Sequence, residues 1–144
     1  MSDSNLQQDI DAIKKLHQGF CAANTTADWP FLEKNVAPED VLVWYNLNQS
    51  NYLGLDHIVE LWKMLASTSE EGARAIMEPR DDEITIMGDA ALVTYLIHFA
   101  ADFGSLGKVS QDARCTEVWR RSEDSWKMIH FHCSNYVPGI MGGK

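Results

Sequence analysis

The sequence predicts an α+β fold, in which helices from the first half of the chain cover one face of a curved, mostly antiparallel sheet. Two observations lead to this prediction. Up to about residue 66, apolar residues recur at the spacings of amphipathic helices, and from about residue 73 to 135 they alternate with polar ones as in strands. Helices followed by a run of strands are typical of α+β domains.

The spacing of apolar residues in the N-terminal segment predicts an amphipathic helix. Polar side chains such as Gln7, Asp11 and Lys14 fill one side of it, and the helix is expected to end near residues 24–26, where short polar side chains compete for backbone hydrogen bonds. Its apolar positions share the other face: Leu6, Ile10, Ile13, Leu16 and Phe20.

A short helix and a strand are predicted next. Asp28 is placed to cap a helix over residues 29–36, and Pro30 fits its first turn, where backbone amides lack helical partners. Pro38 closes this segment. VLVWYN, residues 41–46, predicts a strand because it is rich in β-branched and aromatic residues.

A third helix is predicted after the polar stretch 47–51. Asp56 favours its start through the helix dipole, and Gly72 is placed as its stop. One face of this helix carries Ile58, Leu61, Trp62 and Leu65.

The remaining chain predicts a meander of long strands. Pro79 indicates an edge strand or a bulge, because proline cannot donate to a ladder. The strands and the turns between them are expected at 73–87, Gly88-Asp89, 91–103, 104–107, 108–122, Glu123-Asp124 and 126–135. With neither a repeat nor a linker, residues 1–144 are expected to form a single domain whose segment 136–144 is a loose tail.

Composition excludes several classes of partner. The hydrophobic share of 45% and the charged share of 23% are those of a globular protein. A net charge of −9 opposes binding to nucleic acid and to anionic membranes. No signal peptide or membrane-spanning run is visible, and the three cysteines lack metal-ligand spacing. We therefore expect a reduced, cytoplasmic protein.

The closing hairpin carries a family resemblance. TEVWRRSEDSWKMIHFHCSN, residues 116–135, resembles the last two strands of the NTF2-like superfamily, which includes SnoaL-like and ketosteroid-isomerase-like proteins. It is most similar to the association (hub) domain of calcium/calmodulin-dependent protein kinase II, with its T-x-V-W-x-R strand and its W-x-x-V-H-F-H-x-S strand. Gly88-Asp89, Tyr95 and the YLGLD stretch at 52–56 also agree. The resemblance implies a cystatin-like cone, a curved, mixed, mostly antiparallel sheet wrapped by three N-terminal helices.

The sequence departs from the hub pattern in the pocket. The resemblance implies a pocket lined by arginines that attract carboxylates, but the matching positions here are Ile97, Glu117 and Cys133. Because none of these is basic, we expect a cavity that suits neutral or apolar molecules.

His130 and His132 stand one residue apart in the last predicted strand. Period two places them on the same face as Trp126 and Met128, roughly 7 Å from each other, where a metal could bridge them with a third ligand. The resemblance implies habitual histidines at these positions in proteins without a metal. We interpret them as packing or interface residues and expect no metal and no cofactor, with a catalytic role for His130 as the alternative.

Glu117 is the sharper candidate. It lies in a strand predicted to be central, where a carboxylate is costly to bury unless it is paired. If it faces a cavity, burial raises its pKa and suits it to acid–base catalysis. The alternative is a carboxylate exposed at a strand end, or paired with Arg80, Arg114 or a histidine.

Other candidates are weaker. Asp56 and His57 open the third predicted helix, which in the resembled fold lies over the cavity mouth, and either could be a base or simply a helix-start residue. Candidates for the wall of a ligand pocket are Trp44, Tyr45, Tyr52, Trp62, Tyr95, Ile97, Phe99, Trp119, Phe131 and Cys133.

Two functions of different classes follow. The first is a homo-oligomer, at least a dimer, that binds a small apolar or neutral molecule. The alternative is a cofactor-free isomerase, cyclase or dehydratase with a carboxylate or histidine base and a tyrosine donor. A nuclear-transport adaptor fits least, because nothing in the chain resembles such a partner-binding surface.

Overall fold

The structure is a computed structural model that describes residues 3–38, 42–68, 74–137 and 139–143. Its helices are α1 (Asp3–Thr26), α2 (Trp29–Asn35) and α3 (Leu55–Ala66). Its strands are β1 (Val43–Tyr45), β2 (Asn51–Leu53), β3 (Ala75–Met87), β4 (Ala90–Asp102), β5 (Lys108–Ser122) and β6 (Ser125–Asn135). The predicted α+β class is thereby confirmed. In the part of the chain that the structure describes, no helix has the length and apolar character needed to cross a bilayer.

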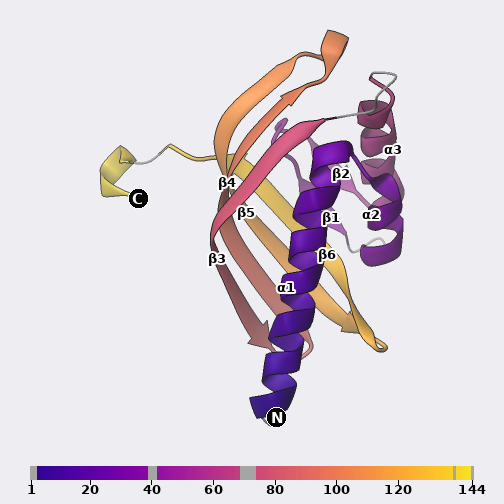
Figure 1. Cartoon of the computed structure of the whole chain (residues 1–144), viewed down its shortest axis with the longest axis vertical. Coiled ribbons are helices and arrows are strands. Elements are labelled where there is room, and N and C mark those ends of the chain that lie inside the picture. Colours follow the sequence, from indigo (N-terminus) through magenta and orange to yellow (C-terminus); the bar gives the residue numbers. More distant parts are fainter. Residues whose placement is uncertain (1–2, 39–41, 69–73, 138, 144) are drawn as a thin grey trace.

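One mixed sheet organises the molecule. The strand order is β2-β1-β6-β5-β4-β3, with β1 parallel to β6 and every other neighbouring pair antiparallel. The long strands bend, and the helices gather on one side of them, with α1 lying along the sheet (Figure 1). The predicted cone, a curved sheet wrapped by three helices, is therefore what the chain forms.

Two irregularities decide which side chains face the helices. In the edge strand β3 the register with β4 shifts between Arg80 and Glu83, and Asp81 there has a φ of 57°. β3 is also the strand that carries Pro79, so the predicted edge position is confirmed. Between β5 and β6 the register shifts so that Ile129 becomes an extra residue.

The second irregularity corrects the alternation expected for β6. Trp126 and Met128 are buried against the helix side, but beyond the bulge the buried residues are Phe131 and Cys133. His130 therefore does not share a face with Trp126 as predicted, because one extra residue inverts the alternation. A strict period of two cannot anticipate such a bulge.

The core lies between α1, α3 and the sheet. Four large rings pack there with centroid separations from 4.7 to 6.3 Å, and each ring belongs to a different element: Phe20, Trp44, Trp62 and Phe131. Such aromatic pairs add roughly 0.5–1.5 kcal/mol each beyond the burial of their area.

Most predicted elements are present, with small differences. Strand β2 was not predicted, because three residues are too few to show an alternation. Asp28 lies at the N-cap of α2 but makes no side-chain capping hydrogen bond. Gly54, with a φ of 85°, is the N-cap of α3, and Asp56 lies in its first turn. Gly72 and residue 41 lie outside the described residues.

Candidate functional site

The helix side of the sheet has a polar part, and it begins with His17. This residue follows Ile13 by four positions and precedes Phe20 by three, so it lies on the buried face of α1. Its side chain is only 2% exposed. A histidine in this position needs hydrogen-bond partners within the protein.

Both nitrogens of the His17 ring face carboxylates. Nδ1 lies 2.7 Å from Glu117 Oε2, and Nε2 lies 2.8 Å from Asp82 Oδ2. Because an ionised carboxylate only accepts hydrogen bonds, each nitrogen must donate a proton, which only the charged imidazolium can do. The geometry therefore describes a cation held between two anions.

The His17 pKa agrees with this geometry. Burial alone would lower the pKa, but the hydrogen bonds to Cys21 and Glu117 and the negative charge of Glu117 outweigh burial and raise the pKa to about 11. His17 is consequently charged through the neutral range. A group with both protons engaged and a pKa this high is poorly suited to act as a general base.

Glu117 is the centre of the polar part. It is fully buried on β5, where it is one of the inward residues, in series with Ala113, Cys115 and Trp119. Its second oxygen, Oε1, accepts a hydrogen bond of 2.9 Å from Trp119 Nε1. Of the alternatives open from the sequence, the structure selects the carboxylate paired with a histidine.

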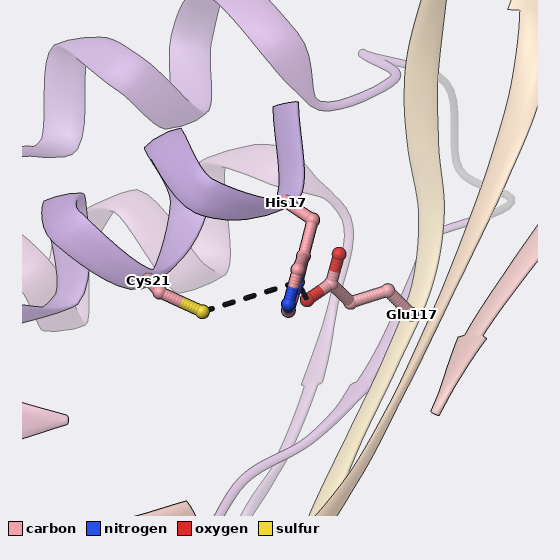
Figure 2. A group of neighbouring side chains, drawn as sticks. All are labelled: His17, Cys21 and Glu117. Atoms are coloured by element: carbon pink, nitrogen blue, oxygen red, sulfur yellow. Dashed lines mark hydrogen bonds and ion pairs between the residues drawn. The ribbon is translucent and has the colours of Figure 1, made fainter. Parts of the chain in front are cut away.

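Two further groups adjoin the pair. Cys21, one turn beyond His17 on α1, places its sulfur 3.9 Å from His17 Nδ1, and burial raises the pKa of its thiol. Figure 2 shows His17 and Cys21 reaching from α1 toward Glu117 on the sheet. The Tyr95 ring stands edge-on to His17 at 4.5 Å, and its buried hydroxyl lacks a hydrogen-bond partner within the described structure. Burial and the nearby charge of Glu117 raise the pKa of Tyr95 well above its ordinary range.

Asp82 links this polar cluster (His17, Cys21, Asp82, Tyr95 and Glu117) to solvent. The β3 bulge turns Asp82 toward His17 while leaving 34% of its side chain exposed. The cluster is therefore closed on the side of the core and reaches water at the sheet edge.

The second part of the interior is an apolar cavity of about 90 Å³ between α1, α3 and the sheet. A space of this size holds several waters or a small organic molecule. Its wall consists of Asn24, Ala27, Asn46, Leu47, Leu61, Trp62, Leu65, Met77, Ile97, Phe99, Phe103, Phe131 and Cys133.

The cavity and the polar cluster are neighbours that do not merge. Ile97 follows Tyr95 by two residues on the same face of β4, and Phe131 lies directly opposite Glu117 on the paired strands. Ile97 and Phe131 line the cavity, whereas Tyr95 and Glu117 do not. The cluster thus lies beside the cavity on the same face of the sheet.

The predicted pocket residues are divided among several environments. Five of them line the cavity: Trp62, Ile97, Phe99, Phe131 and Cys133. Tyr95 and Trp119 belong to the polar surroundings of Glu117, and Trp44 packs in the aromatic core. Tyr45 is 42% exposed, and Tyr52 is half-buried with its ring 5.1 Å from His57.

The predicted acid–base residues do not meet. Glu117 is on the inner face, whereas His130 is on the outer face, where its Nδ1 lies 2.8 Å from the Val43 carbonyl oxygen. Asp56 and His57 are exposed at the start of α3, and the His57 ring accepts the Leu53 amide. Glu117 and His130 are thus on opposite faces of the sheet, and only the consecutive residues Asp56 and His57 lie together.

Sequence reasoning missed His17, Cys21 and Asp82. The signal for His17 was present, because helical spacing places it between Ile13 and Phe20 on the apolar face. Cys21 follows it by one turn. Asp82 could not be found, because its inward direction depends on the bulge in β3.

Comparison with known families gives one broad match. The sequence model of the SnoaL-like domain matches residues 13–138, which includes both the polar cluster and the cavity. No curated protein sequence matches the chain.

Solved structures agree on the fold. An NTF2-like superfamily protein from Salmonella enterica has a TM-score of 0.76 at 16% identity, covering 96% of each chain. A Caulobacter vibrioides protein with a cystatin-like fold has a TM-score of 0.74 at 24% identity, covering 92% of each chain. The S. rosetta hub of calcium/calmodulin-dependent protein kinase II has a TM-score of 0.69 at 19% identity, covering 88% of this chain and 95% of the hub.

Proposed function

We propose that the chain, which belongs to the SnoaL-like domain family, binds a small neutral or apolar molecule in the cavity. Its NTF2-like fold agrees with the resemblance carried by the closing hairpin. The proposal extends to self-association through the sheet face that the helices leave uncovered. The three free, buried thiols fit a reducing compartment such as the cytoplasm.

The chemistry of the cavity wall carries the binding proposal. Apart from the Cys133 thiol, no described residue that lines it has an ionisable side chain. Asn24 and Asn46 provide polar groups that can orient a ligand, while rings and aliphatic side chains form the rest. A carboxylate here would be desolvated without a cationic partner, which costs several kcal/mol. Neutral ligands are therefore favoured.

The same wall argues for binding rather than for acid–base catalysis in this cavity. A cofactor-free isomerase, cyclase or dehydratase needs a base within hydrogen-bond reach of its substrate. Glu117 lies next to Phe131 but does not line the cavity, and its two oxygens already accept hydrogen bonds from His17 and Trp119. Turnover would require both partners to release it.

Ligand binding can be tested with two probes of similar size, one an alcohol and the other a carboxylate. We expect benzyl alcohol to raise the melting temperature and to shift Trp62-dependent fluorescence, and benzoate to do neither. Leu65→Trp, which places a larger ring in the cavity wall, should abolish the effect. Met64→Trp is the matched control, because Met64 is the preceding residue of α3, is 48% exposed and is absent from the wall.

Two results would contradict the binding proposal. One is an equal response of the Leu65→Trp and wild-type proteins to benzyl alcohol. The other is preferential binding of benzoate, which would require a cationic group that the described wall does not provide.

Self-association is supported by the outer face of the sheet. In register across five strands, one row of side chains runs Leu92, Val118, His130, Val43 and Leu53. Its aliphatic members are half-buried, except that Leu53 is 64% exposed. A row that is aliphatic except for His130 on an open face is typical of an interaction surface, and a second copy offers a self-complementary match.

Light scattering at micromolar concentration tests this surface. We expect at least a dimer for the wild-type protein and a monomer for Val118→Arg, in the middle of the row. Met64→Arg, an equally charged change on the helix side, should leave the mass unaltered. A monomeric wild-type protein, or a Val118→Arg variant with unchanged mass, would contradict the proposal.

A further inference from the structure

We propose that His17, Cys21 and Glu117 form a binding site for a divalent transition metal of the zinc type. The three ligand atoms, a ring nitrogen, a sulfur and a carboxylate oxygen, lie within 4.8 Å of one another and are all buried. This inference is independent of the ligand cavity, whose wall contains none of the three residues.

The spacing of the ligand atoms suits a tetrahedral ion. Zinc bonds of about 2.0–2.3 Å place neighbouring ligand atoms roughly 3.5 Å apart. His17 Nδ1 is 2.7 Å from Glu117 Oε2 and 3.9 Å from Cys21 Sγ, and no two of the three ligand atoms are more than 4.8 Å apart, so their separations bracket the tetrahedral value. Two of the ligands come from successive turns of one helix, which fixes their relative position.

Supporting hydrogen bonds of the kind that metal sites use are already present. A histidine that ligates through one nitrogen usually donates its other N–H to a carboxylate. The Nε2 of His17 has this arrangement with Asp82 at 2.8 Å. Trp119 Nε1 holds the other oxygen of Glu117 at 2.9 Å, which orients that ligand as well.

Tyr95 gives an independent indication of a ligand. Its hydroxyl is the buried side-chain atom without a hydrogen-bond partner in the described structure, and its residue is only 3% exposed. The ring packs edge-on against His17 at 4.5 Å. A metal-bound water in the fourth position would supply the partner that this hydroxyl lacks.

The charges balance when a divalent ion binds. Without the ion, the His17 imidazolium offsets one of the two carboxylates, Glu117 and Asp82, so the cluster has one net negative charge. Binding releases one proton from His17 Nδ1 and one from the Cys21 thiol, and the dication then faces a thiolate and two carboxylates. The net charge is again minus one, so no uncompensated charge is created in the core.

The donor set defines the class of ion. A thiolate together with an imidazole favours zinc and similar borderline metals over magnesium and calcium, which prefer oxygen ligands. Asp82, at the β3 bulge, is one-third exposed, so the ligand group is separated from solvent on that side by the His17 ring and Asp82.

Cobalt(II) provides a spectroscopic test on the full chain. After chelation, we expect the wild-type protein to bind one equivalent of Co²⁺, with tetrahedral ligand-field bands in the visible range and a thiolate-to-cobalt charge-transfer band in the near ultraviolet. Zinc should displace the cobalt. Cys21→Ser should lose the charge-transfer band, whereas Cys133→Ser, a control at another buried thiol, should keep it.

Asp82→Asn provides the second arm. Because Asp82 bonds to Nε2 of His17 and not to the proposed ligand nitrogen Nδ1, its loss should weaken zinc affinity by about 10–100-fold without removing the charge-transfer band. Circular dichroism checks the fold of each variant. The proposal is overturned if the wild-type protein binds no Co²⁺, if it binds Co²⁺ without a charge-transfer band, or if that band survives in Cys21→Ser.

Discussion

The polar cluster and the apolar cavity are neighbours on one face of the sheet and share strands β3 and β4, yet they differ in what holds them together. On β4, Tyr95 belongs to the polar cluster and Ile97, one step further along the same face, belongs to the cavity. Between β5 and β6, Glu117 faces the cluster and its partner Phe131 faces the cavity. The polar part is closed and paired by charge, whereas the apolar part is defined by shape.

The polar cluster and the apolar cavity should therefore respond to different kinds of substitution. Removing one partner of a buried ion pair leaves an uncompensated charge, so the polar part depends on chemical identity. The apolar part depends on volume, because its side chains contribute through burial and dispersion. Substitutions at matched positions should therefore lose stability for different reasons and by different amounts.

The largest effect is expected at Glu117. Glu117→Ala should lower the free energy of unfolding by about 3–5 kcal/mol, since it leaves His17 buried with one carboxylate and Trp119 Nε1 without an acceptor. Urea denaturation in the presence of a chelator measures the loss. Glu117→Gln should lose less, because it retains the volume and one acceptor oxygen.

A double-mutant cycle separates the pair from the volume. His17→Leu removes the cation, so Glu117→Ala in that background should cost at least about 1 kcal/mol less than in the wild-type protein. Additive losses would mean that the two residues do not interact energetically, and the contrast between the two parts of the interior would fail.

The next largest effect is expected at Ile97 in the cavity wall. Ile97→Ala should lower the free energy of unfolding by about 2–4 kcal/mol through lost burial and an enlarged cavity, while Ile97→Val costs about 0.5–1.5 kcal/mol. The loss should be independent of pH between 5 and 9, because no charge is involved. A pH-dependent loss would show that Ile97 acts through the neighbouring cluster rather than through volume.

The sequence predicts the apolar part of this contrast better than the polar part. Ile97, expected in the pocket from the resemblance, and Phe99, expected there as an aromatic residue, line the cavity from β4, and the closing hairpin carries enough of the family pattern to predict the cone. Where a strand has no bulge, the alternation of its side chains is sufficient to assign each one to a face of the sheet.

The polar cluster depends on relations that no local pattern contains. His17 and Glu117 are 100 residues apart in the chain, and only the packing of α1 on the sheet brings them together. Asp82 faces inward because of the β3 bulge, and His130 faces outward because of the β6 bulge. One inserted residue inverts a strand's faces, so alternation alone assigns such residues to the wrong side.

The smallest effect is expected at an ion pair of similar chemistry nearer the surface. Arg121 donates two hydrogen bonds to the Asp9 carboxylate, at 3.0 and 2.7 Å, and its side chain is 33% exposed. The hydrogen bonds and charge of Arg121 lower the pKa of Asp9. Because the pair is screened by water, Asp9→Asn should lower the free energy of unfolding by only about 0.5–1 kcal/mol at neutral pH.

The direction of the pH dependence follows from the lowered pKa. The folded state holds Asp9 ionised more strongly than the unfolded chain does, so the stabilisation is present above the ordinary aspartate pKa of about 3.9 and is lost as the pH falls through the folded value. Wild-type and Asp9→Asn proteins should therefore differ at pH 7 and converge in acid, and added salt should reduce the difference at pH 7. Asp11→Asn, an exposed change on the same helix, is the control and should show neither behaviour. If Asp9→Asn instead cost as much as Glu117→Ala, burial would not be what distinguishes the two ion pairs.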